Sequence, residues 1–346
     1  MPEPRPTPPD HQPSEGPSPT GVLLLQMGGP DSLEAVQPFL RNIFSDRDII
    51  QLPGGALLQR PFARLIARLR APEVSENYAR IGGASPIGAT TAAQASGLAA
   101  ELEARGHPMP VAVAMRYWHP FTDEALTELA AAGVGRLVVL SLYPHFSWAT
   151  SGSSLNELMR VHARRGLDLR MTVVDRWYDH PGYLDALARR VRETVTGLGL
   201  RLEDPAVRST VLVLWSAHGL PKRFIDRGDP YVRHVDATLR GVVQRLADLG
   251  LEHRLGYQSR TGPVQWIGPG TEEVLAGAYA DGYRHVVFVP VSFVSDHIET
   301  LYEIEMLFGD EARALGYQTV ARVPAFDAAP DFVALLADLV MERLGA

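Results

Sequence analysis

Two histidines far apart in the chain each follow a run of apolar residues that favour β-structure. His218 comes three residues after the run 211–215, and His297 follows the run 285–289 together with Glu299. The carboxyl ends of parallel strands are where open α/β sheets hold their ligands. Imidazole and carboxylate groups bind divalent metals of borderline softness and transfer protons. The pattern therefore predicts one metal site built from both stretches.

A second glutamate bears on this interpretation. Glu299 and Glu303 are four residues apart, so they share one face of a helix, where two like charges cost stability unless a cation or a proton lies between them. Exposed glutamates at this spacing are also common on surface helices, and Asp296 is a suitable helix cap. A single histidine such as His218 is more often a surface or core residue than a ligand. The placement after apolar strands favours the functional interpretation.

Two further apolar runs end in aromatic and basic residues. Arg116-Tyr-Trp-His-Pro120 follows the run 111–115, and Tyr143-Pro-His-Phe-Ser147 follows the run 137–142. An aromatic lining with an arginine at its edge suits a flat apolar ligand that carries carboxylates. After the first run stands Met27-Gly-Gly-Pro30, where a dinucleotide-binding fold would need G-x-G-x-x-G. The missing fingerprint argues against dehydrogenases and kinases.

The elements that must position these side chains alternate between strand and helix patterns. Such alternation predicts an α/β fold of two similar Rossmann-like domains, each a parallel sheet flanked by helices, with the active-site cleft between them. The strands are nearly all apolar, as expected when both faces of a sheet are covered. The predicted strands span residues 22–26, 111–115, 137–142, 171–174, 210–215, 285–289 and 319–323. The predicted helices span residues 32–42, 57–69, 90–105, 122–132, 155–164, 183–196, 232–249, 272–280 and 331–344.

Local composition divides the chain into segments. Residues 1–20 hold eight prolines and almost no large apolar side chain, which predicts a disordered tail. An N-terminal domain is expected over 21–165 and a C-terminal domain over 166–325, with a weak linker signal at Gly166. Residues 326–346 are expected to form a helix that packs back on the first domain. The segment 52–85 is either a lip over the site or a solvated helix whose arginines face water.

The overall composition excludes several classes of protein. With 46% hydrophobic and 21% charged residues and a net charge of −7, the chain is an ordinary globular protein, and non-specific nucleic-acid binding is disfavoured. It has no cysteine, which excludes disulfides, thiolate metal sites and cysteine-ligated iron–sulfur clusters. No apolar run approaches the roughly 18 residues that span a bilayer, and the tail lacks the apolar core of a signal peptide. A cytoplasmic location is expected.

A series of motifs resembles those of the ferrochelatases, enzymes that insert ferrous iron into a porphyrin to make haem. The motifs keep the family's order and cover about residues 21 to 325. They are Tyr78-Ala-Arg-Ile-Gly-Gly-Ala-Ser-Pro86, Arg116-Tyr-Trp-His-Pro120, Ser151-Gly-Ser-Ser154, Trp215-Ser-Ala-His-Gly-Leu-Pro221, Arg227-Gly-Asp-Pro-Tyr231, Gln258-Ser-Arg260, Trp266-Ile-Gly-Pro269 and Ser295-Asp-His-Ile-Glu-Thr-Leu-Tyr-Glu303.

The resemblance implies a role for each residue of the site. His218 and Glu299 would face each other across the cleft as the catalytic pair, with His218 as the base that takes pyrrole protons or as a metal ligand. His218, Glu299 and Glu303 would contact the metal, and Asp296 and His297 would orient Glu299. The segment 52–85 would close over the porphyrin. The residues expected to bind the substrate are Met27, Arg70, Tyr78, Ser85, Arg116, Tyr117 and Trp266, with the arginines pairing with propionates or framing the pocket.

The resemblance has two limits. Many relatives place a third acidic residue eight positions beyond the catalytic glutamate, where this chain has Leu307, so an acidic iron path is implied only as far as Glu303. Some relatives also hold an iron–sulfur cluster through C-terminal cysteines, which this chain lacks. Ferrous iron would be a substrate, and no tightly bound cofactor is expected.

The choice of porphyrin rests on one position. Met27 resembles the branch that uses protoporphyrin IX and forms protohaem, whereas enzymes acting on coproporphyrin III often carry tyrosine there. Coproporphyrin III stays an alternative substrate. Two further functions stay open, a chelatase for another metal and a non-catalytic porphyrin or haem carrier. A monomer is expected, and contact with a membrane or a haem acceptor is left open.

Overall fold

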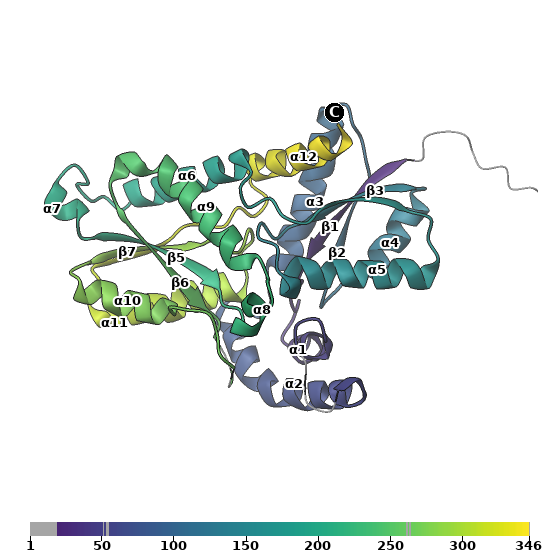
Figure 1. Cartoon of the computed structure of the whole chain (residues 1–346), viewed down its shortest axis with the longest axis horizontal. Coiled ribbons are helices and arrows are strands. Elements are labelled where there is room, and N and C mark those ends of the chain that lie inside the picture. Colours follow the sequence, from purple (N-terminus) through teal and green to yellow (C-terminus); the bar gives the residue numbers. More distant parts are fainter. Residues whose placement is uncertain (1–18, 51, 53–54, 261, 263, 346) are drawn as a thin grey trace, which may run out of the picture.

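The structure is a computed structural model that describes residues 19–50, 52, 55–260, 262 and 264–345. It contains two four-stranded sheets, and every strand pair in both is parallel. Helices flank each sheet (Figure 1), which confirms the predicted α/β architecture of two similar halves. The first sheet holds β1 (Thr20–Gln26), β2 (Val111–Met115), β3 (Arg136–Ser141) and β4 (Arg170–Val174) in the order β2-β1-β3-β4. The second holds β5 (Val211–His218), β6 (Glu252–Gln258), β7 (His285–Pro290) and β8 (Thr319–Arg322) in the order β6-β5-β7-β8.

Each predicted helix is present with its ends shifted by at most four residues, except that the helix predicted over 57–69 continues to Arg80. In the first half the helices are α1 (Val36–Ser45), α2 (Gly55–Arg80), α3 (Ile87–Ala104), α4 (Thr122–Ala131), η1 (Trp148–Gly152) and α5 (Ser153–Arg165). The remainder are α6 (Pro181–Thr196), α7 (Pro205–Arg208), α8 (Lys222–Asp226), α9 (Tyr231–Arg245), η2 (Ala247–Leu249), α10 (Thr271–Ala280), η3 (Glu299–Phe308), α11 (Gly309–Leu315) and α12 (Pro330–Leu344). No helix among the described residues combines the length and apolar character that crossing a membrane requires.

The predicted boundary at residue 165 is too early. β4 pairs with β3, so residues 170–174 complete the first sheet rather than open the second. Gly166, interpreted as a linker, adopts a left-handed conformation and its amide donates to carbonyls in the last turn of α5. It is therefore a helix C-cap within the first half, where glycine is favoured because it has no side chain to clash.

The predicted disordered tail lies largely outside the described residues, which begin at Pro19. Its last residue, Thr20, already belongs to β1 and pairs with Arg136 of β3. The tail prediction is therefore wrong at this end, because pairing with β3 begins before the apolar run that marks the strand in the sequence.

One strand was missed by the sequence pattern. β6 reads Glu-His-Arg-Leu-Gly-Tyr-Gln, and its first four residues are exposed or half-buried. It lies at the edge of the second sheet and pairs only with β5 among the described strands, so it does not need the continuous apolar character of a central strand. Its carboxyl end nevertheless lies beside that of β5, at the edge that carries His218.

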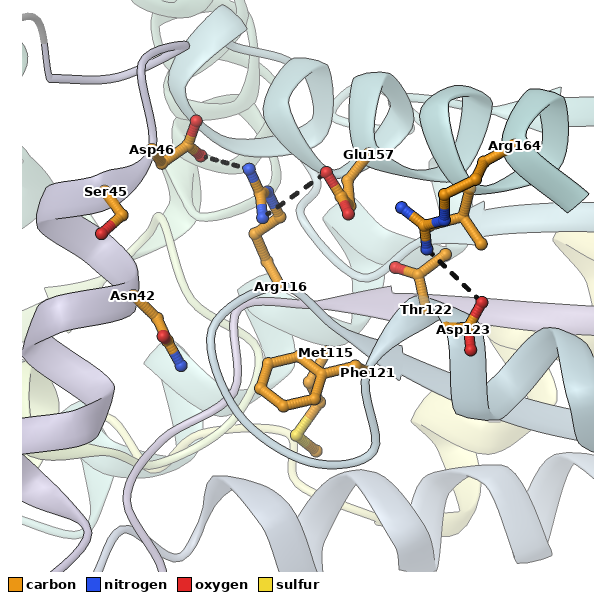
Figure 2. A pocket seen from close by; sticks show the side chains of 11 residues that line it. Asn42, Ser45, Asp46, Met115, Arg116, Phe121, Thr122, Asp123, Glu157 and Arg164 are labelled. Carbon is orange, nitrogen blue, oxygen red and sulfur yellow. Dashed lines mark hydrogen bonds and ion pairs between the residues drawn. The ribbon is translucent and has the colours of Figure 1, made fainter. Parts of the chain in front are cut away.

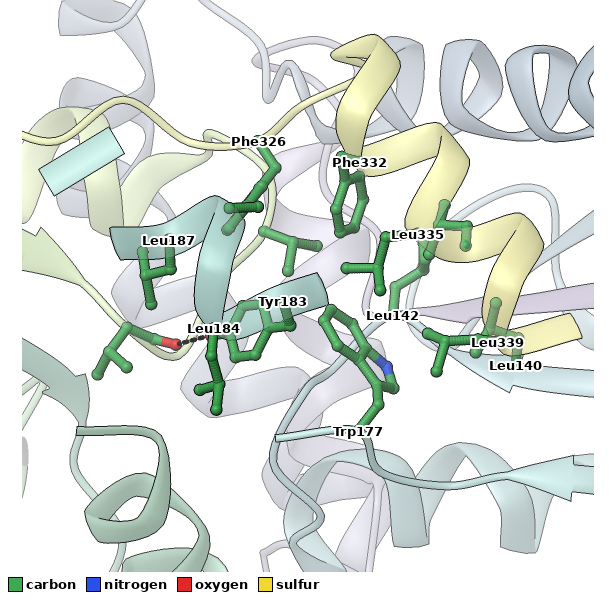
Figure 3. Close-up of a cluster of buried hydrophobic side chains, with 14 of the residues drawn as sticks. Leu140, Leu142, Trp177, Tyr183, Leu184, Leu187, Phe326, Phe332, Leu335 and Leu339 are labelled. Atoms are coloured by element: carbon green, nitrogen blue, oxygen red, sulfur yellow. Dashed lines mark hydrogen bonds between the residues drawn. The ribbon is translucent and has the colours of Figure 1, made fainter. Parts of the chain in front are cut away.

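The two halves share one apolar core. Buried residues of β1 and β5 belong to the same cluster, and α6 and α12 fill the space between the sheets. Figure 3 shows Trp177, Tyr183, Phe326 and Phe332 packed together there. α12 packs against α3, β3 and β4 as well as α6. The contacts of α12 with both halves fix the sheets relative to each other, so side chains from both can contribute to one site.

Candidate active site

His218 and Glu299 form the centre of the site. His218 is the last residue of β5, and Glu299 begins η3 after β7. β5 and β7 are neighbouring parallel strands, so their carboxyl ends deliver both side chains to one edge of the second sheet. His218 Nδ1 lies 2.7 Å from Glu299 Oε2. The expectation that they face each other across a cleft is therefore wrong, because they are hydrogen-bonded neighbours within one half.

The second glutamate is held by the end of β6. The Ser259 amide donates to Glu303 Oε1 at 2.6 Å, and the Ser259 hydroxyl lies 2.5 Å from Glu303 Oε2. The same hydroxyl is 3.1 Å from Glu299 Oε2, and Gln258 Nε2 donates to Glu303 Oε2 at 3.3 Å. Both carboxylates project from η3, which is a π-helix, a rare form found mostly at functional sites.

The pKa values of the pair move in opposite directions. Burial alone would raise the pKa of Glu299, but the charge and hydrogen bond of His218 outweigh it, so the pKa of Glu299 lies well below its usual range. Burial would lower the pKa of His218, and Glu299 outweighs it, so that pKa lies above 6.5. The pair is therefore an imidazolium–carboxylate ion pair at mildly acidic pH, and His218 releases its proton only at higher pH.

Glu303 is shifted the other way. Burial, and then the charge of Glu299, raise its pKa to about 7. Near neutral pH one carboxyl group of the two is therefore charged and the other is close to its midpoint. Such pairs, in which neighbouring groups have separated pKa values, are typical of sites that accept and release protons.

The three predicted metal contacts do not form a ready-made metal site. Among the described residues, no three His, Asp or Glu side chains are placed so that they could hold a metal ion together. Glu299 is engaged by His218, and Glu303 is engaged by Ser259. A metal that binds this cluster must therefore displace hydrogen bonds and protons.

The two residues predicted to orient Glu299 behave differently. His297 is buried beside Glu299, with its Nε2 4.0 Å from Glu299 Oε1, and its Nδ1 donates to the Ser295 carbonyl at 3.1 Å. Burial lowers the pKa of His297, which keeps this ring neutral. Asp296 instead accepts two hydrogen bonds from Arg322, at 2.8 and 3.2 Å, so it anchors the start of η3 to β8 rather than bonding to Glu299.

Tyrosines of the first half approach the same cluster. Burial, and then the charge of Glu299, raise the pKa of both Tyr78 and Tyr143 above the usual value. Tyr78 is near the end of α2 and packs in a cluster with Ile298, which precedes Glu299. The predicted substrate residue Tyr78 therefore lies near Glu299, and α2 contacts η3.

The turn after β1, which begins at Met27, packs against Ser85 through Gly29 and Pro30. A Cβ on Gly29 would lie 2.6 Å from both the Cβ and the Oγ of Ser85, so only glycine permits this approach. The Ser85 amide donates to the Pro30 carbonyl at 2.8 Å. The glycines of this turn therefore serve close packing, which explains a Gly-Gly pair without a phosphate-binding fingerprint.

Arg116 and Tyr117 are bound to a residue that the sequence did not single out. Asp46 follows α1, is buried, accepts a hydrogen bond from the Tyr117 hydroxyl at 2.8 Å and forms an ion pair with Arg116 Nη2 at 2.9 Å. The Arg116 side chain is 14% exposed and borders a cavity of about 320 Å³ together with Glu157 (Figure 2). Neither His218 nor Glu299 lines this cavity. The guanidinium of Arg116 is thus already paired with Asp46 in the first half.

The remaining predicted residues are Trp266 and Arg70. Trp266 forms an isolated bridge with Pro221, and its ring would be 3.5 Å from a Cβ on Gly219, next to His218. Arg70 is on the outer part of α2, with its Nε 3.2 Å from Glu73 Oε2. The structure thus brings Trp266 close to the turn that follows His218 and leaves Arg70 half-exposed in the segment predicted to be the lip.

Several residues that shape the site carried no assigned role in the sequence. Ser292 accepts a hydrogen bond from the His218 amide at 3.1 Å, and the Tyr231 hydroxyl lies 2.6 Å from Ser292 Oγ. Ser259 and Gln258 contact the glutamates. Gln258, Ser259 and Tyr231 stand inside motifs that resemble the family, so the signal was present, but only the fold shows what these side chains bind.

Comparison with known proteins places the whole chain in one family. A family model described as Ferrochelatase matches residues 19–344. The ferrochelatase of Geotalea daltonii is 48% identical over 326 residues, which cover 94% of this chain and 98% of that protein. The ferrochelatase of Synechocystis sp. is 44% identical over 327 residues, which cover 94% and 82% of the two chains.

A solved structure supports the architecture. SirB from Bacillus subtilis with Fe³⁺ superposes with a TM-score of 0.54 and 12% identity, covering 94% of this chain and 95% of that one. At this identity the likeness concerns the fold alone. It agrees with two parallel sheets arranged as in chelatases.

Proposed function

Because the chain belongs to the ferrochelatase family, we propose that it inserts Fe²⁺ into protoporphyrin IX, which forms protohaem and releases two protons. The observation that carries the proposal is the 2.7 Å contact between His218 and Glu299 beside Glu303. Together these side chains provide a base and two carboxyl groups at one point of the sheet edge. A carrier without catalysis would have no use for a cluster of groups whose pKa values are separated.

The chemistry assigned to His218 is removal of pyrrole protons. A rigid apolar macrocycle loses these protons slowly to bulk water, and a positioned imidazole accelerates such a transfer. The negative charge of Glu299 raises the pKa of His218, so neutral His218 is a stronger base than a free imidazole. Its proton must leave before it can act as base or metal ligand, and Glu299 and Glu303 offer the route outward.

The two carboxyl groups receive the metal in this proposal. Fe²⁺ accepts both imidazole and carboxylate ligands. Entry of a dication beside Glu299 and Glu303 removes the repulsion that otherwise favours a proton on Glu303, so metal arrival and proton departure are linked. Iron is a substrate, and no tightly bound cofactor is assigned to the chain, which has no cysteine to hold an iron–sulfur cluster.

Peripheral contact with a membrane is assigned to α2. Its exposed residues Leu58, Leu65 and Leu69 are spaced seven and four positions apart and so form one stripe on the helix, with Leu58 45% and Leu69 69% exposed. Arg60, Arg64 and Arg68 form a parallel exposed row. An apolar stripe beside arginines fits an anionic lipid surface, even though the whole chain is acidic.

The test of the activity is anaerobic turnover with Fe²⁺. Protoporphyrin IX and coproporphyrin III are offered separately to the wild type and to His218→Ala. Multiple turnovers on protoporphyrin that are lost in the variant support the proposal. Faster conversion of coproporphyrin III keeps metal insertion but overturns the choice of substrate from Met27. Tight porphyrin binding without turnover on either would replace the enzyme with a carrier. The monomeric state and the cytoplasmic location stay predictions.

A further inference from the structure

Ser259 has an unusual backbone conformation for its residue type. It follows β6 and has φ 61°, in the left-handed region that non-glycine residues rarely occupy. Only Ser259 and Asp327 show this among the non-glycine residues that the structure describes. Such a conformation costs free energy and persists where surrounding contacts hold it. The contacts that hold Ser259 therefore indicate what the conformation is for.

Those contacts all lead to the two glutamates. The left-handed conformation lets the amide and the hydroxyl of Ser259 donate hydrogen bonds to Glu303 Oε1 and Oε2, at 2.6 and 2.5 Å. The hydroxyl also lies 3.1 Å from Glu299 Oε2. Every hydrogen bond from a described residue to the Glu303 carboxylate comes from Ser259 or its neighbour Gln258. One side chain thus connects the two carboxyl groups and holds them from the same side.

These hydrogen bonds matter because the two carboxyl groups repel each other. Burial and then the charge of Glu299 raise the pKa of Glu303, and both donors of Ser259 act against this. A carboxylate has about four lone-pair positions, so one that accepts two or three hydrogen bonds can still bind a cation. Position 307 offers no further carboxylate, since Leu307 stands there with its side chain 48% exposed. The arrangement of the acidic pair therefore depends on the end of β6.

We propose that Ser259 is a positioning residue that sets the carboxyl groups of Glu299 and Glu303 at the separation in which they receive Fe²⁺. The inference rests on the proposed function of metal insertion and names a residue that controls its iron step. Ser259 does not touch the porphyrin in this account, so its removal affects iron and not the macrocycle.

The decisive variant is Ser259→Gly. Glycine adopts φ 61° without strain and keeps the amide, so only the hydroxyl is lost. We expect the KM for Fe²⁺ to rise about 10- to 100-fold, which is typical when a residue that orients a metal ligand is removed. The KM for porphyrin and the Tm should stay at wild-type values. Ser259→Ala removes the same hydroxyl and retains the strained backbone, so it should match the glycine variant in KM for Fe²⁺ and fall below it in Tm.

A double-variant cycle shows whether Ser259 acts through Glu303. In a Glu303→Gln background the change Ser259→Gly should alter the KM for Fe²⁺ much less than in the wild type, because contacting residues are not additive. An effect of unchanged size in both backgrounds would contradict the assigned partner. A wild-type KM for Fe²⁺ in Ser259→Gly would overturn the proposal. A rise in the KM for both Fe²⁺ and porphyrin, together with a fall in kcat and Tm, would overturn it as well.

Failure of the proposed function would look different. It would appear as wild-type protein that turns over neither porphyrin. Anaerobic titration of the porphyrin-free protein with Fe²⁺ then decides the point about Ser259 alone. Weaker Fe²⁺ binding by Ser259→Gly than by wild type supports the positioning role, and equal binding overturns it.

Discussion

The carboxyl edges of the two sheets use charge in opposite ways. At the first edge, buried Asp46 is balanced by Arg116, whose guanidinium never loses its charge, and Tyr117 and Ser153 complete its hydrogen bonds. At the second edge, Glu299 is balanced by His218, whose charge is lost once the pH rises above the raised pKa of this imidazole. The first ion pair is permanent and the second is conditional. The difference is the one expected from the proposed function, in which the first half frames the site and the second half carries out the proton transfer.

The positions of the partners make the same distinction. Asp46, Arg116 and Ser153 come from three separate elements of the first half, so their contacts join α1, β2 and α5. The contacts of His218, Glu299 and Glu303 stay within the second half, at the ends of β5 and β6 and on η3. A network that joins several elements stabilises the fold. A cluster at the edge of one sheet can change its protonation state without destabilising the fold.

The largest expected effect comes from removing the conditional charge. His218→Ala should lower kcat by about 10²- to 10⁴-fold, the range that a positioned general base supplies. Anaerobic turnover with Fe²⁺ and protoporphyrin IX measures it. The matched control is His119→Ala, an exposed histidine paired with Glu124 in the first half, which should stay within about twofold of wild type. Wild-type turnover by His218→Ala would contradict the assignment of proton transfer to the second edge.

Removing the permanent pair should affect stability instead. Asp46→Ala leaves the Arg116 guanidinium largely buried without its close partner, which should cost about 3 to 5 kcal/mol of unfolding free energy. Denaturant unfolding measures this, with kcat of the folded fraction staying within a few-fold of wild type. Asp48→Ala, which removes a surface ion pair with Arg160, should cost about 1 kcal/mol or less. Equal costs for the two variants would show that burial of the first pair is unimportant.

Protonation of Glu303 gives a smaller effect that depends on pH. Its pKa is raised from 4.5 to about 7, so its contribution to stability is complete below pH 4.5 and is lost as the pH rises through 7. Glu303→Gln cannot ionise and should be more stable than wild type at pH 8 by about 1 to 3 kcal/mol, with the difference disappearing near pH 4.5. Thermal unfolding at several pH values checks this, with Glu305→Gln on the same helix as the charge control. A difference that does not vary with pH would contradict the shift.

The smallest effect on catalysis is expected at α2. Replacing Leu58 and Leu69 by glutamine should weaken binding to anionic phospholipid vesicles by about tenfold or more, because each buried leucine contributes about 1.5 to 3 kcal/mol. Turnover in solution should be unchanged. Met159→Gln removes an exposed apolar residue from α5 and should leave vesicle binding as in wild type. Equal vesicle binding by all these proteins would remove the membrane assignment from α2.

The sequence predicted most of the architecture because the central strands are buried on both faces and therefore read as apolar runs. β6 was not predicted, because an edge strand needs no such run. The role of Ser259 was not predicted either, because it depends on a backbone angle that no residue pattern reveals. His218 and Glu299 were recognised, but not their direct contact, because strand order in the sheet decides which carboxyl ends are neighbours. Asp46 follows α1 without any distinguishing pattern, so its bond to Arg116 appears only in the fold.

The central claim is that His218 and Glu299 form one titrating pair, and nuclear magnetic resonance of the His218 ring against pH tests it most directly. The account predicts a pKa above 6.5 in the wild type, and in Glu299→Gln a pKa that falls to 6.5 or below, because burial then acts without the opposing charge. A wild-type pKa at or below 6.5 that does not change in Glu299→Gln would contradict the account.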